Sequence, residues 1–411
     1  MTSERRVDTG EFGTGGQVEV PDLEALEEVR TVARARLAPL TADFDADRVN
    51  RPLLEAMGEA GLLGRLFPSL GPDEAATDVS ATELCLLREA IASVDTHAET
   101  ALALQGLGGY PIIQAGSPET RKRWVPEIVR GRAVAAFALS EPGAGSDAAA
   151  IETHAEREGD GWRLYGEKTW ISNAPEADVY SIFVKTAPQA GSRGVSAFAL
   201  PGDRAGISGE HIDLLAPHPI GRLVLDGAYV GAEDLLGEEN KGFRVAMRTL
   251  NLFRPSVGAF ATGMARAALD AAVVHGETRM AFGAALAEQQ SVSHVLAQMA
   301  TRLEAARLLV YAAASAYDHG DEQEKQARLS AMAKFFATET AQYVIDRALQ
   351  VHGARGLTSG SLLEHLYREV RATRIYEGAS EVQLTIIGRS LRKGVRAAGG
   401  APGDQKGADR P

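Results

Sequence analysis

The sequence predicts a mostly α-helical protein with a β domain in its centre, and two patterns lead to this class. Apolar residues recur three and four positions apart before residue 135 and again from about residue 241, which is the period of amphipathic helices. Short β-rich runs broken by turn residues fill the stretch between. With 411 residues, 45% of them hydrophobic, the chain is long enough for two or three domains with a core.

A helical N-terminal domain is predicted for residues 19–135. The run LEALEEVRTVARARLAPL from Leu23 and the run ATELCLLREAIASVD from Ala81 both repeat apolar residues at helical spacing, and neither contains a glycine. Residues 1–18, which precede this domain, are polar and glycine-rich, so we expect them to be disordered.

A central β domain is predicted for residues 136–236. A Gly-Asp-Gly turn at 159–161 leads into a strand-like run that contains Trp162 and Leu164, in the pattern of a hairpin. Three further strand-like runs follow: VYSIFVKT from Val179, VSAFAL from Val195 and RLVLDGAYV from Arg222.

A C-terminal helical bundle is predicted for residues 237–393. Long amphipathic helices, which commonly pack into a bundle, return in this part of the chain. One face of the clearest helix carries Val292, Val295, Leu296, Met299, Leu303, Ala306 and Val310. The tail at 394–411 is polar and glycine-rich, and we expect it to be disordered.

Composition and charge exclude several classes of function. The net charge of −12 argues against a nucleic-acid surface, which needs clustered Lys and Arg. The single cysteine, Cys85, and nine scattered histidines predict no disulfide within the chain and no metal site. No apolar run approaches the ~18 residues that span a bilayer, and the N-terminus has no apolar core for export. We therefore expect a cytoplasmic protein without a membrane partner.

The segment FALSEPGAGSD, from Phe137, contains a glycine-rich loop. Its GAGSDA core fits the dinucleotide fingerprint, but that fingerprint needs a helix directly after it, and here a turn and a strand are predicted. Two other interpretations stay open, a loop without a ligand and a loop that holds the edge of a flavin. Gly143 and Gly145 would permit close backbone approach, and Ser140 and Ser146 supply hydroxyls.

Two further motifs contain an aromatic residue that could cover a flat ring. In KTWISN, from Lys168, Trp170 stands near a small hydroxyl residue, although an isolated tryptophan is also common in cores. In RMAFGAALAEQQ, from Arg279, the arginine could bind a pyrophosphate through two hydrogen bonds, and Phe282 could stack on a base. A turn between helices with a surface arginine is the alternative.

The motif RIYEGASEVQ, from Arg374, places a carboxylate before a glycine just after a helical run. Glu377 could be a general base held in a tight, partly apolar turn, with Gly378 letting a substrate come close. The alternative is a solvated glutamate in a loop.

In this order and at these distances, the four motifs resemble those of the acyl-CoA dehydrogenase family, over about residues 20–393. QVHGARGL at 350–357 and NLFRPSVGA at 251–259 resemble two further signatures. The resemblance implies an N-terminal helical domain, a middle β-barrel domain and a C-terminal four-helix bundle. It also implies FAD bound non-covalently between domains and across a subunit contact of a homotetramer or dimer.

The resemblance assigns three groups of residues to the cofactor. Those expected to line the flavin are Phe137, Leu139, Ser140, Gly145, Ser146, Trp170, Ile171 and Ser172. Those expected at the pyrophosphate and adenine end, partly from a neighbouring subunit, are Arg279, Phe282, Gln290, Gln350, Gly353 and Ala354. Those expected to close over the cofactor are Ala379, Ser380 and Glu381.

The same resemblance implies dehydrogenation of an acyl thioester to the 2-enoyl thioester, with the flavin as hydride acceptor. Glu377 stands at the position of the base that removes the α-proton. Some relatives carry their base immediately before the arginine of the sixth motif, where this chain has Phe253. Glu377 is therefore the only candidate base. The residues expected at the substrate are Ser146, Asn251, Arg254 and Gly378.

Departures from the family pattern leave the thioester carrier open between CoA and an acyl-carrier protein. Asn251 stands where aspartate is common, Ala354 where a second glycine is common and Ala379 where threonine is common. We expect electron-transfer flavoprotein as the electron acceptor. A flavin-dependent monooxygenase on this fold and a scaffold without flavin are the alternatives. The retained Glu377 favours dehydrogenation, and the intact Arg279 and Trp170 motifs disfavour the scaffold.

Overall fold

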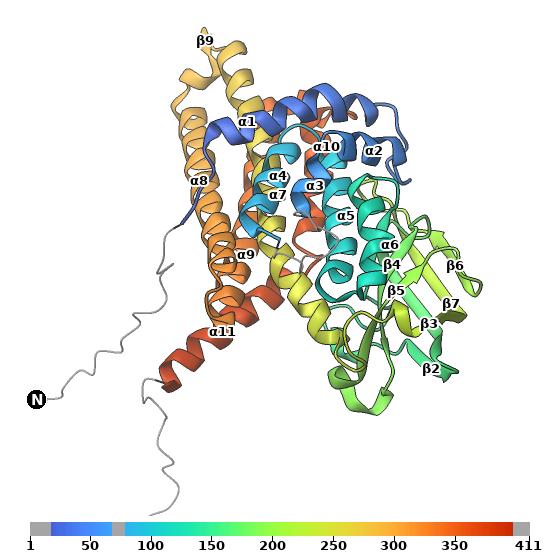
Figure 1. Cartoon of the computed structure of the whole chain (residues 1–411). Helices are drawn as coiled ribbons and strands as arrows, with labels where there is room; N and C mark the ends of the chain where they lie inside the picture. Colours follow the sequence, from blue (N-terminus) through green and yellow to red (C-terminus); the bar gives the residue numbers. More distant parts are fainter. Residues whose placement is uncertain (1–17, 68–78, 398–411) are drawn as a thin grey trace, which may run out of the picture.

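The structure, a computed structural model, describes residues 18–67 and 79–397 and places a helical part and a curled sheet beside a long helical bundle (Figure 1). The predicted class, mostly α with a central β domain, is confirmed. The segments at 1–18 and 394–411, which we expected to be disordered, lie outside the described residues except for Val18 and residues 394–397. The latter continue the last helix.

Six helices form the N-terminal part: α1 (Leu23–Val32), α2 (Arg51–Glu59), α3 (Leu62–Leu66), α4 (Ala81–Ala92), α5 (Thr96–Ala115) and α6 (Pro118–Val129). Five of them begin at a side chain that accepts a backbone N–H of the first turn, and these caps are Asp22, Asn50, Ser80, Asp95 and Ser117. The two helices predicted from the sequence are α1 and α4. The first of them continues beyond Val32 as a π-helical turn.

Seven strands form one curled sheet: β1 (Ala135–Ala138), β2 (His154–Glu158), β3 (Gly161–Ser172), β4 (Val179–Lys185), β5 (Val195–Pro201), β6 (Ile207–His211) and β7 (Ile220–Val230). Their order is β1-β4-β2-β3-β7-β6, with β5 paired to β4. β2 and β3 are antiparallel neighbours, which confirms the hairpin predicted around residues 159–161. The last residues of β3 belong to the KTWISN motif.

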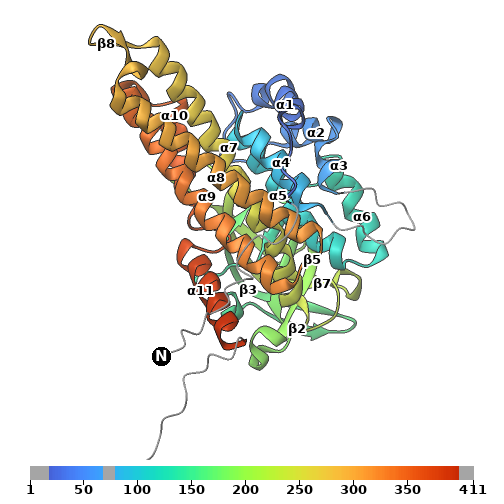
Figure 2. The same ribbon diagram turned by 90° about the vertical axis from the view of Figure 1, so that its left-hand side faces the viewer.

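The bundle consists of α7 (Gly242–Thr278), α8 (Gln290–Asp318), α9 (Gln323–His352), α10 (Leu362–Thr373) and α11 (Ser380–Ala397). Helices α7, α8 and α9 lie side by side (Figures 1 and 2). A small hairpin, β8 (Met280–Ala281) with β9 (Ala284–Ala285), joins α7 to α8 at the far end of the bundle (Figure 1). Four residues of the predicted face of α8 are buried: Met299, Leu303, Ala306 and Val310.

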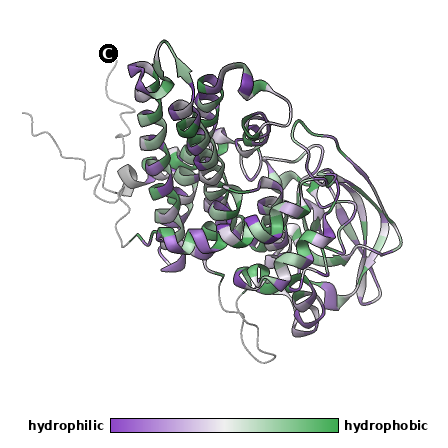
Figure 3. Cartoon of the chain, turned by 90° about the horizontal axis from the view of Figure 1, so that it is seen from above, coloured by the Kyte–Doolittle hydropathy of each residue, from purple (hydrophilic) through white to green (hydrophobic). Residues whose placement is uncertain are grey.

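Helix α7 is the longest element, with 37 residues. Within the described residues it is the one helix that by length and composition could cross a membrane. Of its most apolar window, however, 67% is buried inside the fold, as in a core helix. Figure 3 shows hydrophobic and hydrophilic residues mixed around the helices, as expected when each buries one face.

Helix α5 docks on the sheet through a close contact at Gly108. A Cβ at this position would lie 2.5 Å from the backbone N of Ala136 and 2.9 Å from the Cβ of Ala135. Ser181 of β4 donates its hydroxyl to the carbonyl of Gly108 at 2.7 Å, and Ala135 donates its N–H to Gln105 Oε1 at 2.7 Å. The sheet is therefore held against α5 by contacts that leave no room for a larger side chain.

Replacing Gly108 by alanine is expected to destabilise the fold by about 1–3 kcal/mol, because the new Cβ must displace the backbone of β1. Gly388→Ala is the matched control, since no atom lies within 4 Å of a Cβ built at Gly388 in α11. Alanine there is expected to gain about 0.5–1 kcal/mol. Denaturant unfolding followed by circular dichroism compares the two, and an unchanged stability of Gly108→Ala would contradict the close contact.

Candidate active site

Glu377 lies in the loop between α10 and α11, where the backbone adopts a conformation that few residues tolerate. Its φ is 51° and that of Gly378 is 95°, both in the left-handed region. The φ of Gly378 favours glycine, and a Cβ there would lie 2.4 Å from Nε2 of Gln383, so this side chain would have to move. The turn directs Glu377 inward, and its Oε2 is buried without a hydrogen-bond partner in the described part of the chain.

Three cations from three helices surround this carboxylate. They are Arg88 on α4, Arg254 on α7 and Lys334 on α9. Burial raises the pKa of Glu377, and the three positive charges oppose that rise. Burial also lowers the pKa of Lys334 to about 8, against the attraction of Glu377. Glu377 is therefore a carboxyl group of raised proton affinity whose charge is balanced from several sides.

The backbone of the loop is fixed by two side chains that donate to one carbonyl. Lys334 Nζ donates to the carbonyl of Gly378 at 2.8 Å, and Gln383 Nε2 donates to the same oxygen at 2.9 Å. Among residues 18–67 and 79–397, no acceptor takes the backbone N–H of Glu377. Since backbone donors are rarely left unpaired, this N–H is available to a ligand.

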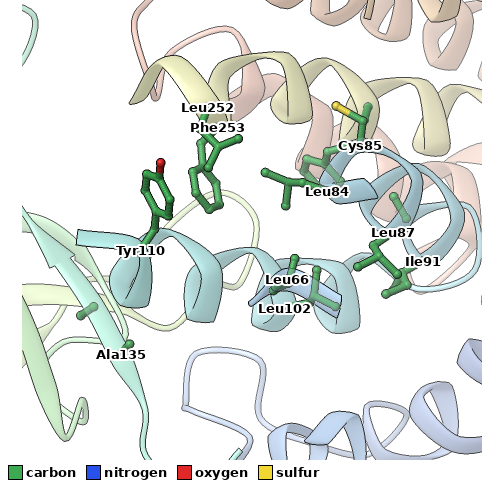
Figure 4. Packing of buried hydrophobic residues seen from close by; sticks show 14 of the residues in the cluster. Leu66, Leu84, Cys85, Leu87, Ile91, Leu102, Tyr110, Ala135, Leu252 and Phe253 are labelled. Carbon is green, nitrogen blue, oxygen red and sulfur yellow. The ribbon is translucent and has the colours of Figure 1, made fainter. Parts of the chain in front are cut away.

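The predicted substrate residues Asn251 and Arg254 lie on α7, where Arg254 Nη1 donates to Asn251 Oδ1 at 2.9 Å. Arg254 Nε is buried and has no partner among the described residues. Phe253 packs between α5 and α7, with its ring 6.4 Å from that of Tyr110 (Figure 4). An apolar core residue thus occupies the position at which some relatives carry their base.

On the sheet, the glycine-rich segment and the KTWISN motif lie side by side. The N–H of Thr169 donates to the carbonyl of Ser140 at 3.0 Å. The fully buried Lys168 donates to the carbonyl of Leu139 at 3.0 Å and to Glu141 Oε1 at 2.7 Å. These bonds hold the segment at Leu139 and Ser140 beside the end of β3, where the predicted flavin residues Trp170, Ile171 and Ser172 lie. Of the other predicted flavin residues, Phe137 lies on β1, and Gly145 and Ser146 follow in the glycine-rich loop.

Trp170 is the most conspicuous member of this group. It is 56% exposed, and its φ of 60° places a bulky residue in the left-handed region. Gly143 and Gly145 have no atom within 4 Å of a built Cβ, so the neighbouring loop is open. Ile171, by contrast, is buried in the core, so only its backbone is available to a ligand.

The hydroxyl of Ser172, at the end of β3, lies 2.9 Å from Nε2 of His218. Burial, and to a smaller extent His97, lowers the pKa of His218 to about 4, so this histidine is neutral. A small cleft of about 40 Å³ lies on this side, and its walls include His97, Asn173 and His218. Neither Ser172 nor Glu377 is among the residues that line it, so the cleft lies on the His218 side of this contact and apart from Glu377.

Six other predicted cofactor residues lie on the exposed end of the bundle: Arg279, Phe282, Gln290, Gln350, Gly353 and Ala354. The stacked rings of His275 and His352, 4.2 Å apart, join the ends of α7 and α9 there. Phe282 is 95% exposed and has a φ of 54°. The β8–β9 hairpin that carries it stands away from the sheet (Figure 1). One chain therefore does not bring these six residues to Trp170.

Ala379, Ser380 and Glu381 lie where α11 begins. Ser380 is buried and donates its hydroxyl to Glu339 Oε1 at 3.0 Å, an oxygen that also accepts from Arg374 Nε at 2.7 Å. Glu381 is exposed. Ser380 therefore has a partner within its own chain and helps to hold the start of α11.

The sequence motifs did not include Arg88, Glu99 and Lys334. Arg88 and Glu99 are 3% and 0% exposed and form a buried ion pair on α4 and α5. Each of the three stands on a helix outside every motif. The one signal in the sequence is a pair of charges inside the apolar run CLLREAIA, since charged residues are rarely buried unless paired.

Comparisons with known proteins cover nearly the whole chain. Family models described as the N-terminal, middle and C-terminal domains of acyl-CoA dehydrogenase match residues 22–132, 136–227 and 240–392. Cyclohexane-1-carbonyl-CoA dehydrogenase of Geobacter metallireducens is 35% identical over 387 residues, 93% of this chain and 99% of the relative.

Two solved structures have the same fold. Butyryl-CoA dehydrogenase from Megasphaera elsdenii has a TM-score of 0.84 and 31% identity, over 91% of this chain and 100% of that chain. A chain from a structural study of the electron transferring flavoprotein of Acidaminococcus fermentans also has a TM-score of 0.84, with 34% identity over 91% of this chain and 99% of that one.

Lys168→Met is expected to lower the free energy of unfolding by about 3–5 kcal/mol, because it leaves the buried carboxylate of Glu141 without its cation. Arg36→Met breaks the exposed pair with Glu59 and is the control, with an expected loss of about 0–1 kcal/mol. Urea unfolding measures both variants. Similar losses in the two would show that the Lys168–Glu141 pair does not hold the glycine-rich loop to β3.

Proposed function

The chain belongs to the acyl-CoA dehydrogenase family, and from that premise we propose that it catalyses the FAD-dependent α,β-dehydrogenation of an acyl-CoA to the 2-enoyl-CoA. The family suggested by the sequence motifs is confirmed, and with it the class of oxidoreductase. The observation that carries the proposed reaction is the buried, unpartnered Oε2 of Glu377 in a loop of left-handed backbone.

The exposed residues suit FAD in two separate places. Trp170 offers a flat ring, and the open loop at Gly143 and Gly145 offers backbone donors. Arg279 offers a planar guanidinium for a pyrophosphate, and Phe282 offers a ring for the adenine. When bound, FAD supplies the hydride acceptor of the reaction. Because the two places are apart in one chain, we propose a homotetramer or dimer in which neighbouring chains share each cofactor.

Glu377 takes the α-proton of the acyl group on a carboxylate oxygen. The charges of Arg88, Lys334 and Arg254 favour the ionised form, so that the base is ready before the substrate arrives. An acyl group that fills the site removes water and raises the pKa of Glu377 further, toward the range in which a general base is effective.

The thioester oxygen gains negative charge as the proton leaves, and it needs a donor at that moment. The unpaired backbone N–H of Glu377 supplies one. Lys334 and Gln383 hold the next carbonyl in place, so the donor is already oriented when the charge develops. Asn251 and Arg254, one turn apart on α7, face the same space and position the thioester arm.

Three further proposals concern the electron acceptor, the carrier of the acyl group and the location of the protein. Electron-transfer flavoprotein is our proposed electron acceptor, and the similarity to a chain from a study of such a flavoprotein supports it. CoA is the proposed carrier, because the relatives named above act on CoA thioesters. The cytoplasm is the proposed location, on the basis of composition.

The purified protein is expected to be yellow, with about one FAD per chain. Arg279→Ala should lower flavin retention more than it alters the chemical step, since a charge-assisted pyrophosphate contact is worth about 1.5–3 kcal/mol. The absorbance ratio of flavin to protein after dialysis measures occupancy, and size-exclusion chromatography measures assembly. Equal occupancy in variant and wild type would refute the role of Arg279, and a protein that takes up no FAD would refute the flavoenzyme.

Glu377→Gln keeps the size of the side chain but removes the base. The variant should fold, bind FAD and bind the acyl-CoA, and it should reduce the flavin about 10²–10⁴-fold more slowly. Anaerobic stopped-flow measurement of flavin bleaching gives the rate. Phe253→Leu is the control, because it changes the alternative base position without touching a proton-transfer group. Near wild-type bleaching by Glu377→Gln would show that another group removes the proton.

A further inference from the structure

Arg88 and Glu99 form a buried ion pair that makes no hydrogen bond to Glu377 within the described residues. Arg88 on α4 donates through Nε to Glu99 Oε1 on α5. Its Nη1 donates to the hydroxyl of Ser256 on α7 at 2.8 Å. The guanidinium also lies 5.7 Å from the ring centre of Phe260 on α7. Three helices therefore meet at one polar cluster. Figure 4 shows buried apolar residues of the same helices, among them Leu87, Leu102 and Phe253.

This cluster is close enough to Glu377 for their charges to interact. The positive charge of Arg88 is the largest influence that lowers the pKa of Glu377 against burial. The negative charge of Glu377 in turn raises the pKa of Glu99, which burial brings to about 7. The Arg88–Glu99 pair and Glu377 therefore lie in one buried region.

Hydrogen-bonding capacity in this space is left unused. Glu99 Oε2 is fully buried and has no partner in the described residues, and the same holds for Glu377 Oε2 and Arg254 Nε. Nη2 of Arg88 donates to none of the described residues either. Buried polar atoms in proteins are nearly always paired, so several unpaired atoms at one place indicate that a bound molecule completes them.

We propose that the Arg88–Glu99 pair forms the far end of the acyl pocket and selects acyl groups that carry a hydroxyl at their distal end. The inference rests on the proposed function, since it requires that an acyl thioester binds with its α-carbon at Glu377. Glu99 Oε2 accepts a hydrogen bond from the substrate hydroxyl, and Nη2 of Arg88 donates one to it.

A hydroxyl suits this end of the pocket better than the two common alternatives. A methyl group would cover an acceptor and a donor without pairing either, which carries the full desolvation cost. A carboxylate would bring another negative charge beside Glu99, where Arg88 already pairs with Glu99 and also acts on Glu377. A hydroxyl is neutral and can both donate and accept.

Matched acyl-CoA esters that end in a hydroxyl, a methyl or a carboxylate test the proposal, for example 6-hydroxyhexanoyl-, heptanoyl- and adipoyl-CoA, with shorter and longer members of each series. Equilibrium dialysis against the FAD-loaded Glu377→Gln protein gives Kd without turnover, and the wild type gives kcat/KM. At the best length, the hydroxyl ester is expected to bind about 10- to 100-fold more tightly than its methyl counterpart, as for a hydrogen bond to a charged group.

Variants show whether the pair is responsible for this preference. Arg88→Met combined with Glu99→Leu should reverse it, because the end of the pocket becomes apolar. Glu89→Leu combined with Arg307→Met is the matched control, since Glu89 adjoins Arg88 on α4 but pairs with Arg307 on α8 in an equally buried contact. It should leave the preference unchanged. If the first double variant does not fold, Ser256→Ala removes only the hydroxyl that holds Nη1 and should reduce the preference several-fold.

The outcomes separate this inference from the proposed function. A protein that binds and oxidises the methyl esters as well as the hydroxyl esters at every length would overturn the inference and leave the dehydrogenase intact. Tightest binding of the carboxylate esters would also overturn it, because the pocket would then select an anion. A protein that binds none of the esters and reduces no flavin with any of them would overturn the proposed function itself.

Discussion

The constraint on which the site depends is the burial of one carboxyl group, that of Glu377, without a direct ion-pair partner in the described residues. A buried carboxylate that is alone loses its charge, and one in a tight ion pair loses its basicity. Here three cations from α4, α7 and α9 act on it together, while its Oε2 stays unpaired. This requires three helices to converge on one loop, and the left-handed turn at Glu377 and Gly378 points the side chain toward them.

Two buried ion pairs support the two sides of the site. Lys168 and Glu141 tie the glycine-rich loop to β3 on the sheet side, and Arg88 and Glu99 join α4 to α5 on the helical side. Helix α5 links the sides, because it carries Glu99 near one end and docks on β1 at Gly108 further along. A buried ion pair need not add net stability, but losing one partner is costly, so such pairs fix relative positions. Helix α5 thus connects the sheet that carries Trp170 with the helices around Glu377.

The sequence predicted the fold class and the motif residues because these rest on local patterns, namely helical period, turn residues and unusual dipeptides. Trp170, Phe282 and Glu377 are three of the five described non-glycine residues with a left-handed φ, so three of the motifs coincide with positions of uncommon backbone conformation. Arg88, Glu99 and Lys334 escaped prediction because each acquires its neighbours only when separate helices pack together. The sequence does not show whether a charged residue within an apolar helix is buried until its partner is known. The partner of Arg88 is Glu99, which stands 11 residues away on another helix.

The separation of the cofactor residues within one chain has a consequence for assembly under the proposed function. Trp170 lies on the sheet, while Arg279 and Phe282 lie on the exposed end of the bundle (Figure 1). FAD that contacts both kinds of residue must take one kind from another copy of the chain. The apolar side chains exposed there, among them Met280 and Leu357, would lose water when a second chain covers them. Association of the chains brings the Trp170 surface of one copy to the exposed bundle end of another, and bound FAD contacts both. Association and cofactor binding therefore stabilise each other.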